Sequence, residues 1–235
     1  AIMGMARLGE STASERPLIA VTTLGGTTNC ALEVKRRMED RGYEVVIFHA
    51  NGCGGRAMEE MTQEGFIQGV FDLSTNEVVD HLYGGWSDAG PQRLEVAGSM
   101  GIPQLIAPGN IDHVIYSSPE KIPDRFKNHY IHVHAENIHV VRTEEEEMRE
   151  IAKSMADKIN KARGKVAVIL PLRGLSILDR TDKDFDRPEA NQAYFEALKR
   201  YLRPDITVRE VDAHITDTAF AEEATAMLCE IMEKS

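Results

Sequence analysis

The sequence predicts an α/β protein, a Rossmann-like three-layer sandwich with a mostly parallel central sheet of about six strands. Short apolar runs rich in β-branched residues alternate with segments of helical periodicity from residue 17 onward. The runs are continuous, as in residues 45–48, which is typical of strands covered on both faces. Glycine-rich turns follow the first two runs and precede helical segments. Consecutive units of this kind indicate right-handed βαβ crossovers, with the loops after the strands meeting at one edge.

Each element follows from its local pattern. The expected strands are residues 18–22, 45–48, 69–73, 104–107, 166–170 and 206–211. The expected helices are residues 31–41, a segment from residue 56, 92–100, 144–161, 189–202 and a closing helix that carries residues 220–231. Residues 81–91 are too rich in glycine for regular structure and hold the only tryptophan, which indicates a mobile lid or an oligomer contact. Residues 117–130 contain two prolines and are expected to form an irregular surface excursion.

Length and composition bound the class of protein. The chain has 235 residues, of which 42% are hydrophobic and 28% charged, as in ordinary globular proteins. A net charge of −11 without a dense basic block argues against nucleic acid and anionic membranes as partners. The sequence has no apolar run of membrane-spanning length and no signal peptide, so a cytoplasmic protein is expected. Three scattered cysteines argue against a disulfide framework or a zinc finger.

The first residues are expected to lie outside the domain. The chain begins at Ala1 and not at a methionine, and residues 1–16 resemble a linker or the end of a preceding helix. We therefore predict a fragment of a longer protein, in which residues 17–235 form a single domain.

Residues 51–56 predict an anion-binding loop. Gly52, Gly54 and Gly55 surround Cys53, and Arg56 follows with a run of good helix formers. Free N–H groups at such a helix start, together with the helix dipole and an arginine, bind phosphate or carboxylate groups. The alternative is a tight strand-to-helix turn that binds nothing. Cys53 is in addition a candidate nucleophile, because a helix start stabilises a thiolate.

Polar residues also follow later strands. Ser74, Thr75 and Glu77 come after the run 69–73; they either cap the next helix, with Glu77 completing a capping box, or face a ligand. Asp112 and Asp179 follow two other strands and are candidate catalytic acids or bases. Because the carboxyl ends of parallel strands share one edge, these residues are expected to line one site.

Two further groups have candidate roles. Arg173 and Ser176, after the run 166–170, form a second candidate anion grip. His132 and His134 are two residues apart in an extended segment, so they share a face and are candidate metal ligands. The alternative for the histidines is an ordinary polar strand face.

Several loops taken together resemble a known family. The motifs occur in the order GCGGRAME, DLSTNE, GGWSDAGPQRLE, PGNID, VVRTEEEE, LPLRGLSILD and HITD. They are similar to those of the C-terminal domain of the tobamovirus-resistance-protein-like, ATP-binding family, whose bacterial members are largely uncharacterised. The resemblance implies a longer protein of two Rossmann-like domains. It also implies a functional set of Gly52, Gly54, Gly55, Arg56, Ser74, Thr75, Glu77, Arg93, Asp112, Arg173, Ser176 and Asp179. The chain departs from the family where Ala135 and Glu136 replace an Asn-Pro pair and where Thr216 replaces an asparagine.

Three functions agree with these loops. The first is a binding domain for a nucleotide or another small phosphate or carboxylate anion, which works with the N-terminal domain of the same protein. The second is a hydrolase or lyase of a small acidic metabolite, with Asp112 or Asp179 as base and Arg56 and Arg173 as anion clamps. The third is a protein-interaction module that uses residues 81–91, as a plant family member that inhibits tobamovirus replication implies. A homo-oligomer is expected, and the full-length protein is expected to bind ATP or a divalent cation.

Overall fold

The central sheet is parallel throughout. The computed structural model describes residues 16–233, so residues 1–15 of the predicted linker lie outside the described part. Within residues 16–233, six strands form the sheet. They are β1 (Leu18–Thr23), β2 (Glu44–His49), β3 (Gly69–Ser74), β4 (Gln104–Gly109), β8 (Val166–Pro171) and β9 (Thr207–Val211). Every predicted strand is found within two residues of its expected bounds, and the predicted α/β sandwich is confirmed.

The strand order creates a switch point between β1 and β3. The strands follow the order β2-β1-β3-β4-β8-β9. β1 pairs with β2 from Leu18 opposite Glu44 to Thr23 opposite His49, and with β3 on its other side. The crossover after β1 therefore leads to one side of the sheet and the crossover after β3 to the other. Ligand crevices of open parallel sheets form at such points.

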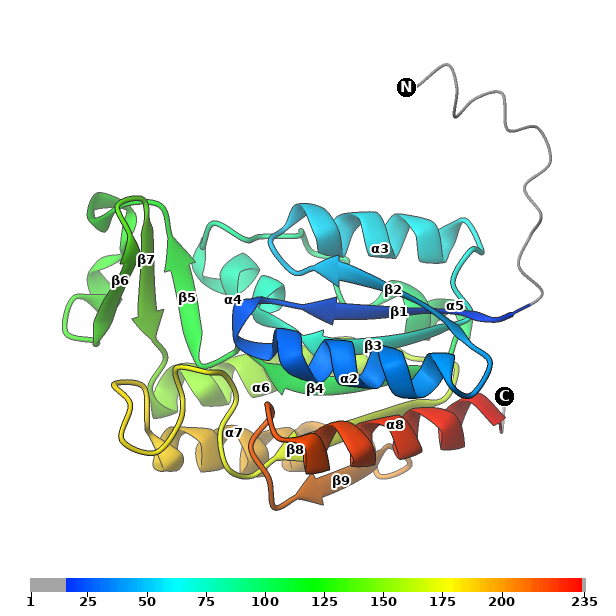
Figure 1. Cartoon of the computed structure of the whole chain (residues 1–235). Helices are drawn as coiled ribbons and strands as arrows, with labels where there is room; N and C mark the ends of the chain where they lie inside the picture. Colours follow the sequence, from blue (N-terminus) through cyan, green and yellow to red (C-terminus); the bar gives the residue numbers. More distant parts are fainter. Residues whose placement is uncertain (1–15, 234–235) are drawn as a thin grey trace.

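Helices cover both faces of this sheet (Figure 1). One face is covered by α2 (Thr28–Glu39) and α8 (Thr218–Glu233). The other is covered by α3 (Cys53–Gln63), α4 (Asn76–Tyr83), α5 (Val96–Met100), α6 (Glu145–Ile159) and α7 (Pro188–Tyr201). The predicted apolar stripe of the closing helix is buried at Phe220, Ala224 and Met227. None of the described helices is long and apolar enough to cross a membrane.

A second, antiparallel sheet is present that the sequence did not predict. It comprises β5 (His113–Tyr116), β7 (Ile138–Arg142) and β6 (Ile131–Ala135), in that order. Figure 1 shows this small sheet beyond the carboxyl ends of β1 and β2. The sequence indicated only the extended segment around His132 and His134, because the pairing of these strands, as between Val114 and Val141, joins distant segments. Residues 117–130, which were expected to be irregular, contain two short 3-10 turns, at Pro119–Lys121 and Asp124–Phe126.

Three local predictions are wrong. α4 continues to Tyr83, into the segment 81–91 that was expected to be irregular. The helix expected from residue 92 begins only at Val96, because residues 91–95 form turns. Thr75 occupies the N-cap of α4 but makes no capping hydrogen bond, so the predicted capping box is not formed. The Thr75 hydroxyl donates instead to the main-chain oxygen of Ala107, at 3.3 Å, and Glu77 bonds to the start of α3.

Candidate functional site

The start of α3, predicted to bind an external anion, holds an internal one. Both Gly52 and Gly55 donate their main-chain N–H groups to Oε1 of Glu77, at 2.7 and 3.1 Å. The loop needs glycine for two reasons: Gly52 has a φ of +90°, and a Cβ on Gly55 would lie 2.0 Å from Oε2 of Glu77. The close backbone approach inferred from the glycines therefore serves the Glu77 carboxylate, which takes the place expected for a ligand.

Arg93 holds the other side of the same carboxylate. It is 1% exposed; its Nε lies 2.7 Å from Oε2 of Glu77, and its Nη1 lies 2.6 Å from Asp72 and 3.3 Å from Glu59. One cation thus faces three acids in the core. Burial, aided by the charge of Asp72, raises the pKa of Glu59 to about 7. Arg93 and Glu77, predicted as ligand contacts, are therefore bound to each other inside the protein.

Arg56 and Cys53 stay at the surface beside this loop. The Nε of Arg56 donates to the main-chain oxygen of Gly52 at 3.2 Å, and its Nη2 lies 3.9 Å from the Sγ of Cys53. Gly54 donates its N–H to the side chain of Asn51, at 3.2 Å. The exposed part of the predicted anion loop is thus an arginine next to a thiol.

A chain of buried hydroxyl groups joins the loops at the switch point. The Oγ atoms of Thr27 and Ser74 lie 2.7 Å apart, and Ser74 donates to Oδ1 of Asn110 at 2.8 Å. Thr23 lies within 3.0 Å of Thr27, which extends the chain into β1. A Cβ on Gly26 would lie 2.6 Å from Nδ2 of Asn110, so the glycine lets the first loop close against the loop after β4. The loops after three strands are thereby held in fixed relative positions.

Asn76 is a residue that the sequence reasoning missed. It begins α4, two residues after Ser74, and is 0% exposed. Neither its Oδ1 nor its Nδ2 has a hydrogen-bond partner within residues 16–233. A buried, unpaired amide is costly, and such a group commonly marks a bound water, ion or ligand. Its position directly after the Ser-Thr pair at a strand end was the signal in the sequence.

Asp112 and Ser176, predicted separately, are in direct contact. The Oγ of Ser176 donates to Oδ2 of Asp112 at 2.7 Å, and both residues are 0% exposed. Nδ1 of His113 lies 3.3 Å from the other carboxylate oxygen. Burial alone raises the pKa of Asp112, but the neighbouring imidazole, the guanidinium of Arg142 and the Ser176 hydroxyl together hold it below its usual range.

Asp179 belongs to the same buried group. Its Oδ2 accepts the N–H of Leu175 at 2.8 Å and the Nδ2 of Asn191 at 2.7 Å, and Oδ1 lies 3.8 Å from Nη2 of Arg142. Burial and the charge of Asp112 raise the pKa of Asp179 to about 6. The environment therefore separates the pKa values of two neighbouring carboxyl groups, which is an arrangement that suits acid–base chemistry.

The remaining candidates lie apart from this group. Arg173 is exposed and its guanidinium is paired with Asp212 in the loop after β9. His132 and His134 are on the small sheet, with their ring centroids 6.1 Å apart. Within residues 16–233, no group of three or more His, Cys, Asp or Glu side chains is arranged to hold a metal ion.

The buried acids predict a pH dependence of stability. Burial raises the pKa of Asp80, whose carboxylate accepts the N–H groups of Ser87 and Ile115, to about 7, as it does for Glu59. Between about pH 4 and 7, Asp80 and Glu59 are therefore protonated in the folded state but ionised in the unfolded state. The stability that this proton binding contributes is lost as the pH rises through 7. Thermal unfolding should show a higher midpoint at pH 6.5 than at pH 8.

The variant Glu59→Gln tests the origin of this pH dependence. It removes one of the two groups and should reduce the difference in stability between pH 6.5 and pH 8. Each proton changes the free energy of unfolding by at most about 1.4 kcal/mol per pH unit. His214, whose pKa is lowered by burial, acts in the opposite direction, and its contribution to the pH dependence fades as the pH rises above 6.5. A midpoint that is constant or rises from pH 6.5 to 8 would show that these acids are ionised in the folded protein.

Comparisons with known proteins identify relatives over nearly the whole chain. The model of the C-terminal domain of the uncharacterised protein family UPF0261 matches residues 16–232. A UPF0261 protein of Clostridium tetani is 40% identical over 221 residues, which are 94% of this chain and 55% of that protein. The ToMV resistance protein Tm-1(GCR237) of Solanum lycopersicum is 38% identical over 219 residues, 92% of this chain and 29% of that protein. The chain thus spans about half the length of the bacterial relative.

Among solved structures, a thioesterase domain from a curacin biosynthetic pathway aligns with 94% of this chain and 92% of its own. The TM-score is 0.39 and the sequence identity 10%. A likeness of this degree carries no argument about function.

Proposed function

Because the chain belongs to the UPF0261 family, as its C-terminal domain, we propose that it is a small-molecule-binding domain that holds the phosphate or carboxylate group of an anionic ligand at the switch point between β1 and β3. The observation that carries the proposal is Asn76, a fully buried amide at this strand end that has no partner within residues 16–233. Its free donor and acceptor match the polar groups of a nucleotide or a small acid.

The start of α2 would supply N–H donors for the anion. Its first turn has no acidic side chain, and Thr27 at its N-cap makes no capping hydrogen bond. Gly25, Thr28 and Asn29 at this helix start are exposed. In contrast, the start of α3 is occupied by Glu77. The positive end of the α2 dipole therefore faces no carboxylate of its own first turn, and anions are favoured there.

The hydroxyl chain supports the proposal by fixing the walls of the site. Thr27, Ser74 and Asn110 link the loops after β1, β3 and β4 through buried hydrogen bonds. A site held in place before the ligand arrives loses less entropy on binding. ATP is one proposed ligand, and the greater length of the bacterial relative supports a site completed by an N-terminal domain.

Calorimetry with ATP, ADP and inorganic phosphate tests the site through the variant Thr28→Asp. A carboxylate in the first turn of α2 stabilises the helix but repels an anion at its N-terminus. The expected result is an affinity lower by about tenfold or more with an undiminished unfolding midpoint.

The matched control is Thr218→Asp, which places the same charge in the first turn of α8, also at a strand-end loop. It should leave binding unchanged. Arg56→Ala separates the two helix starts, because it weakens binding only if the ligand lies at α3. Failure of all three anions to bind, or equal binding by Thr28→Asp and the unmodified protein, would contradict the proposal.

One observation favours a second function, a hydrolase or lyase of a small acidic metabolite. Asp112 and Asp179 are neighbours whose pKa values are shifted in opposite directions, as expected of an acid and a base. Both are buried, so a substrate reaches them only if the surrounding structure opens. Turnover that is lost in Asp179→Asn, with ligand affinity retained, would support this function over binding alone.

A further inference from the structure

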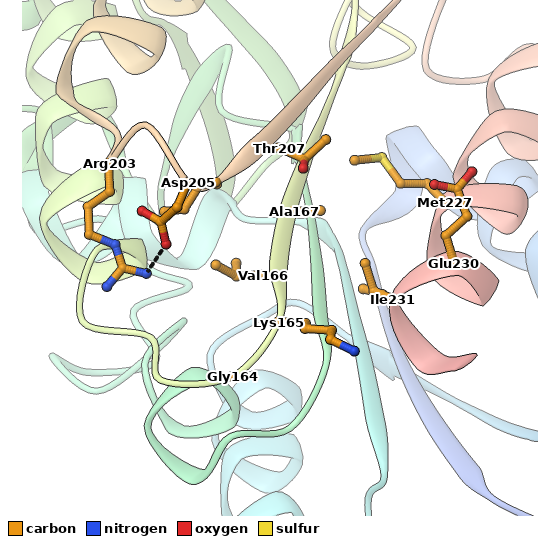
Figure 2. Close-up of a pocket in the computed structure, with 11 residues that line it drawn as sticks. Gly164, Lys165, Val166, Ala167, Arg203, Asp205, Thr207, Met227, Glu230 and Ile231 are labelled. Atoms are coloured by element: carbon orange, nitrogen blue, oxygen red, sulfur yellow. Dashed lines mark hydrogen bonds and ion pairs between the residues drawn. The ribbon is translucent and has the colours of Figure 1, made fainter. Parts of the chain in front are cut away.

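A cavity of about 280 Å³ lies at the opposite end of the strands from the candidate site. It is formed where β8 and β9 begin and where α8 ends, as Figure 2 shows. By volume it is about twice the size of a cavity that admits one benzene molecule. The cavity therefore suits a ligand of modest size, and it is separate from the loops discussed above.

One part of the cavity wall is apolar. Val166 and Ala167 of β8 contribute from the sheet, and Met227 and Ile231 contribute from α8 (Figure 2). Ala167 and Met227 are each 1% exposed, so this surface continues directly into the core between α8 and the sheet. An aliphatic chain of a few carbons would bury itself against these side chains.

The polar part of the wall has an unbalanced positive charge. Glu230 is paired with Arg209, at 3.0 Å, and Asp205 with Arg203, at 3.2 Å. In contrast, Lys165 makes no side-chain hydrogen bond or ion pair with any residue from 16 to 233. Both acids that line the cavity thus have a cation, whereas Lys165 has no anion.

A second cationic side chain has an unsatisfied donor. The terminal nitrogens of Arg203 bond to main-chain oxygens of Asn160 and Ala162 and to Asp205. Its Nε is buried and has no hydrogen-bond partner in the described part of the chain. Because this nitrogen has no surface facing the cavity and the outer nitrogens are already paired, the exposed Lys165 is the cation that a ligand in the cavity would meet.

We propose that this cavity binds a small aliphatic monocarboxylate, with the carboxylate at Lys165 and the chain against Met227 and Ile231. Charge complementarity selects an acid over an amine, because both carboxylates of the wall are already paired. The site lies at the amino ends of the strands and is independent of the anion site at α2.

Hexanoate, hexan-1-ol and hexylamine are the probes, followed by NMR of the methyl groups of Met227 and Ile231. Hexanoate should shift both methyl signals saturably, and it should bind about tenfold or more tightly than the alcohol, which lacks the charge. Hexylamine should bind no better than the alcohol. Thr28→Asp should leave hexanoate binding unchanged, so that this proposal and the proposed function fail separately.

Two variants locate the ligand. Lys165→Met should weaken hexanoate binding by about tenfold and leave hexan-1-ol binding unchanged, whereas Lys121→Met, at an exposed lysine elsewhere, should change neither. Thr207→Phe, at an exposed position on β9 that lines the cavity, should fill it and abolish both. The proposal would be overturned by any of three results: no saturable shift, equal affinity for acid and alcohol, or unchanged binding by Lys165→Met. Circular dichroism and unfolding midpoints confirm that each variant is folded.

Discussion

Replacing Arg93 by methionine is expected to lower the free energy of unfolding by about 3–5 kcal/mol, the usual cost of removing one partner from a buried ionic group. The substitution keeps the long aliphatic stem and removes the cation that contacts Glu77, Asp72 and Glu59. Buried carboxyl groups are then left without an opposite charge, among them Glu77, which accepts the N–H groups of Gly52 and Gly55. Denaturant-induced unfolding at pH 7 measures the effect.

The control for this variant is Arg149→Met. Arg149 pairs with Glu145 at 2.6 Å, but both side chains are more than half exposed, so its loss should cost less than about 1 kcal/mol. Lowering the pH to 5 should reduce the difference in stability between Arg93→Met and the unmodified protein, because protonation then partly removes the unpaired charge of the buried acids. Equal stability at pH 7 would show that the core does not depend on this charge balance.

Arg142→Met is expected to have an effect of similar size, about 3–5 kcal/mol. Arg142 is 0% exposed at the end of β7, and it donates to the main-chain oxygens of Phe185 and Asp112, at 2.9 and 3.2 Å, and to Asn191 at 3.1 Å. One guanidinium thus ties the small sheet to the loop after β8 and to α7. Its removal leaves several buried acceptors unpaired and takes the positive charge away from Asp179.

Hydrogen exchange distinguishes this role from a general loss of stability. Amide protection should fall most in β5 and β7 and in the loop after β8, while β1 and β3 change in line with global stability. The pKa of Asp179 should rise further above 6, because Arg142 lowers it in the unmodified protein. Arg36→Met, at an exposed arginine of α2, is the control and should change neither property. Uniform loss of protection would argue against a local tie.

Local patterns were sufficient for the main sheet. Residues 45–48 and 166–170 are continuous apolar runs, and both form strands of this sheet, although residues 46–48 on the edge strand β2 are only half-buried. The strand His113–Tyr116 was missed because its neighbours in sequence say nothing about Val141, its partner in the small sheet. The loop motifs also indicated a family with a plant resistance protein, and the tomato resistance protein is 38% identical to the chain over 219 residues.

The candidate site was predictable as a set of residue types but not as a set of contacts. The sequence indicated that residues 52–56 form an anion loop, yet the anion on Gly52 and Gly55 is Glu77. Ser176 and Asp112 were both chosen, but their 2.7 Å hydrogen bond was not foreseen. Asn76 was overlooked, because an asparagine at a helix start is ordinary until its lack of a partner is known.

The sequence by itself determined the α/β class, the six parallel strands and the strand ends at which polar residues collect. These depend on backbone propensity and on the periodicity of burial, which act within a few residues. The tertiary structure alone decided which acid fills the α3 loop, that Arg93 is internal, and that Arg142 joins two sheets. Those outcomes depend on side chains brought together from positions far apart in the chain, where burial makes each unpaired charge or hydrogen-bonding group costly enough to select its partner.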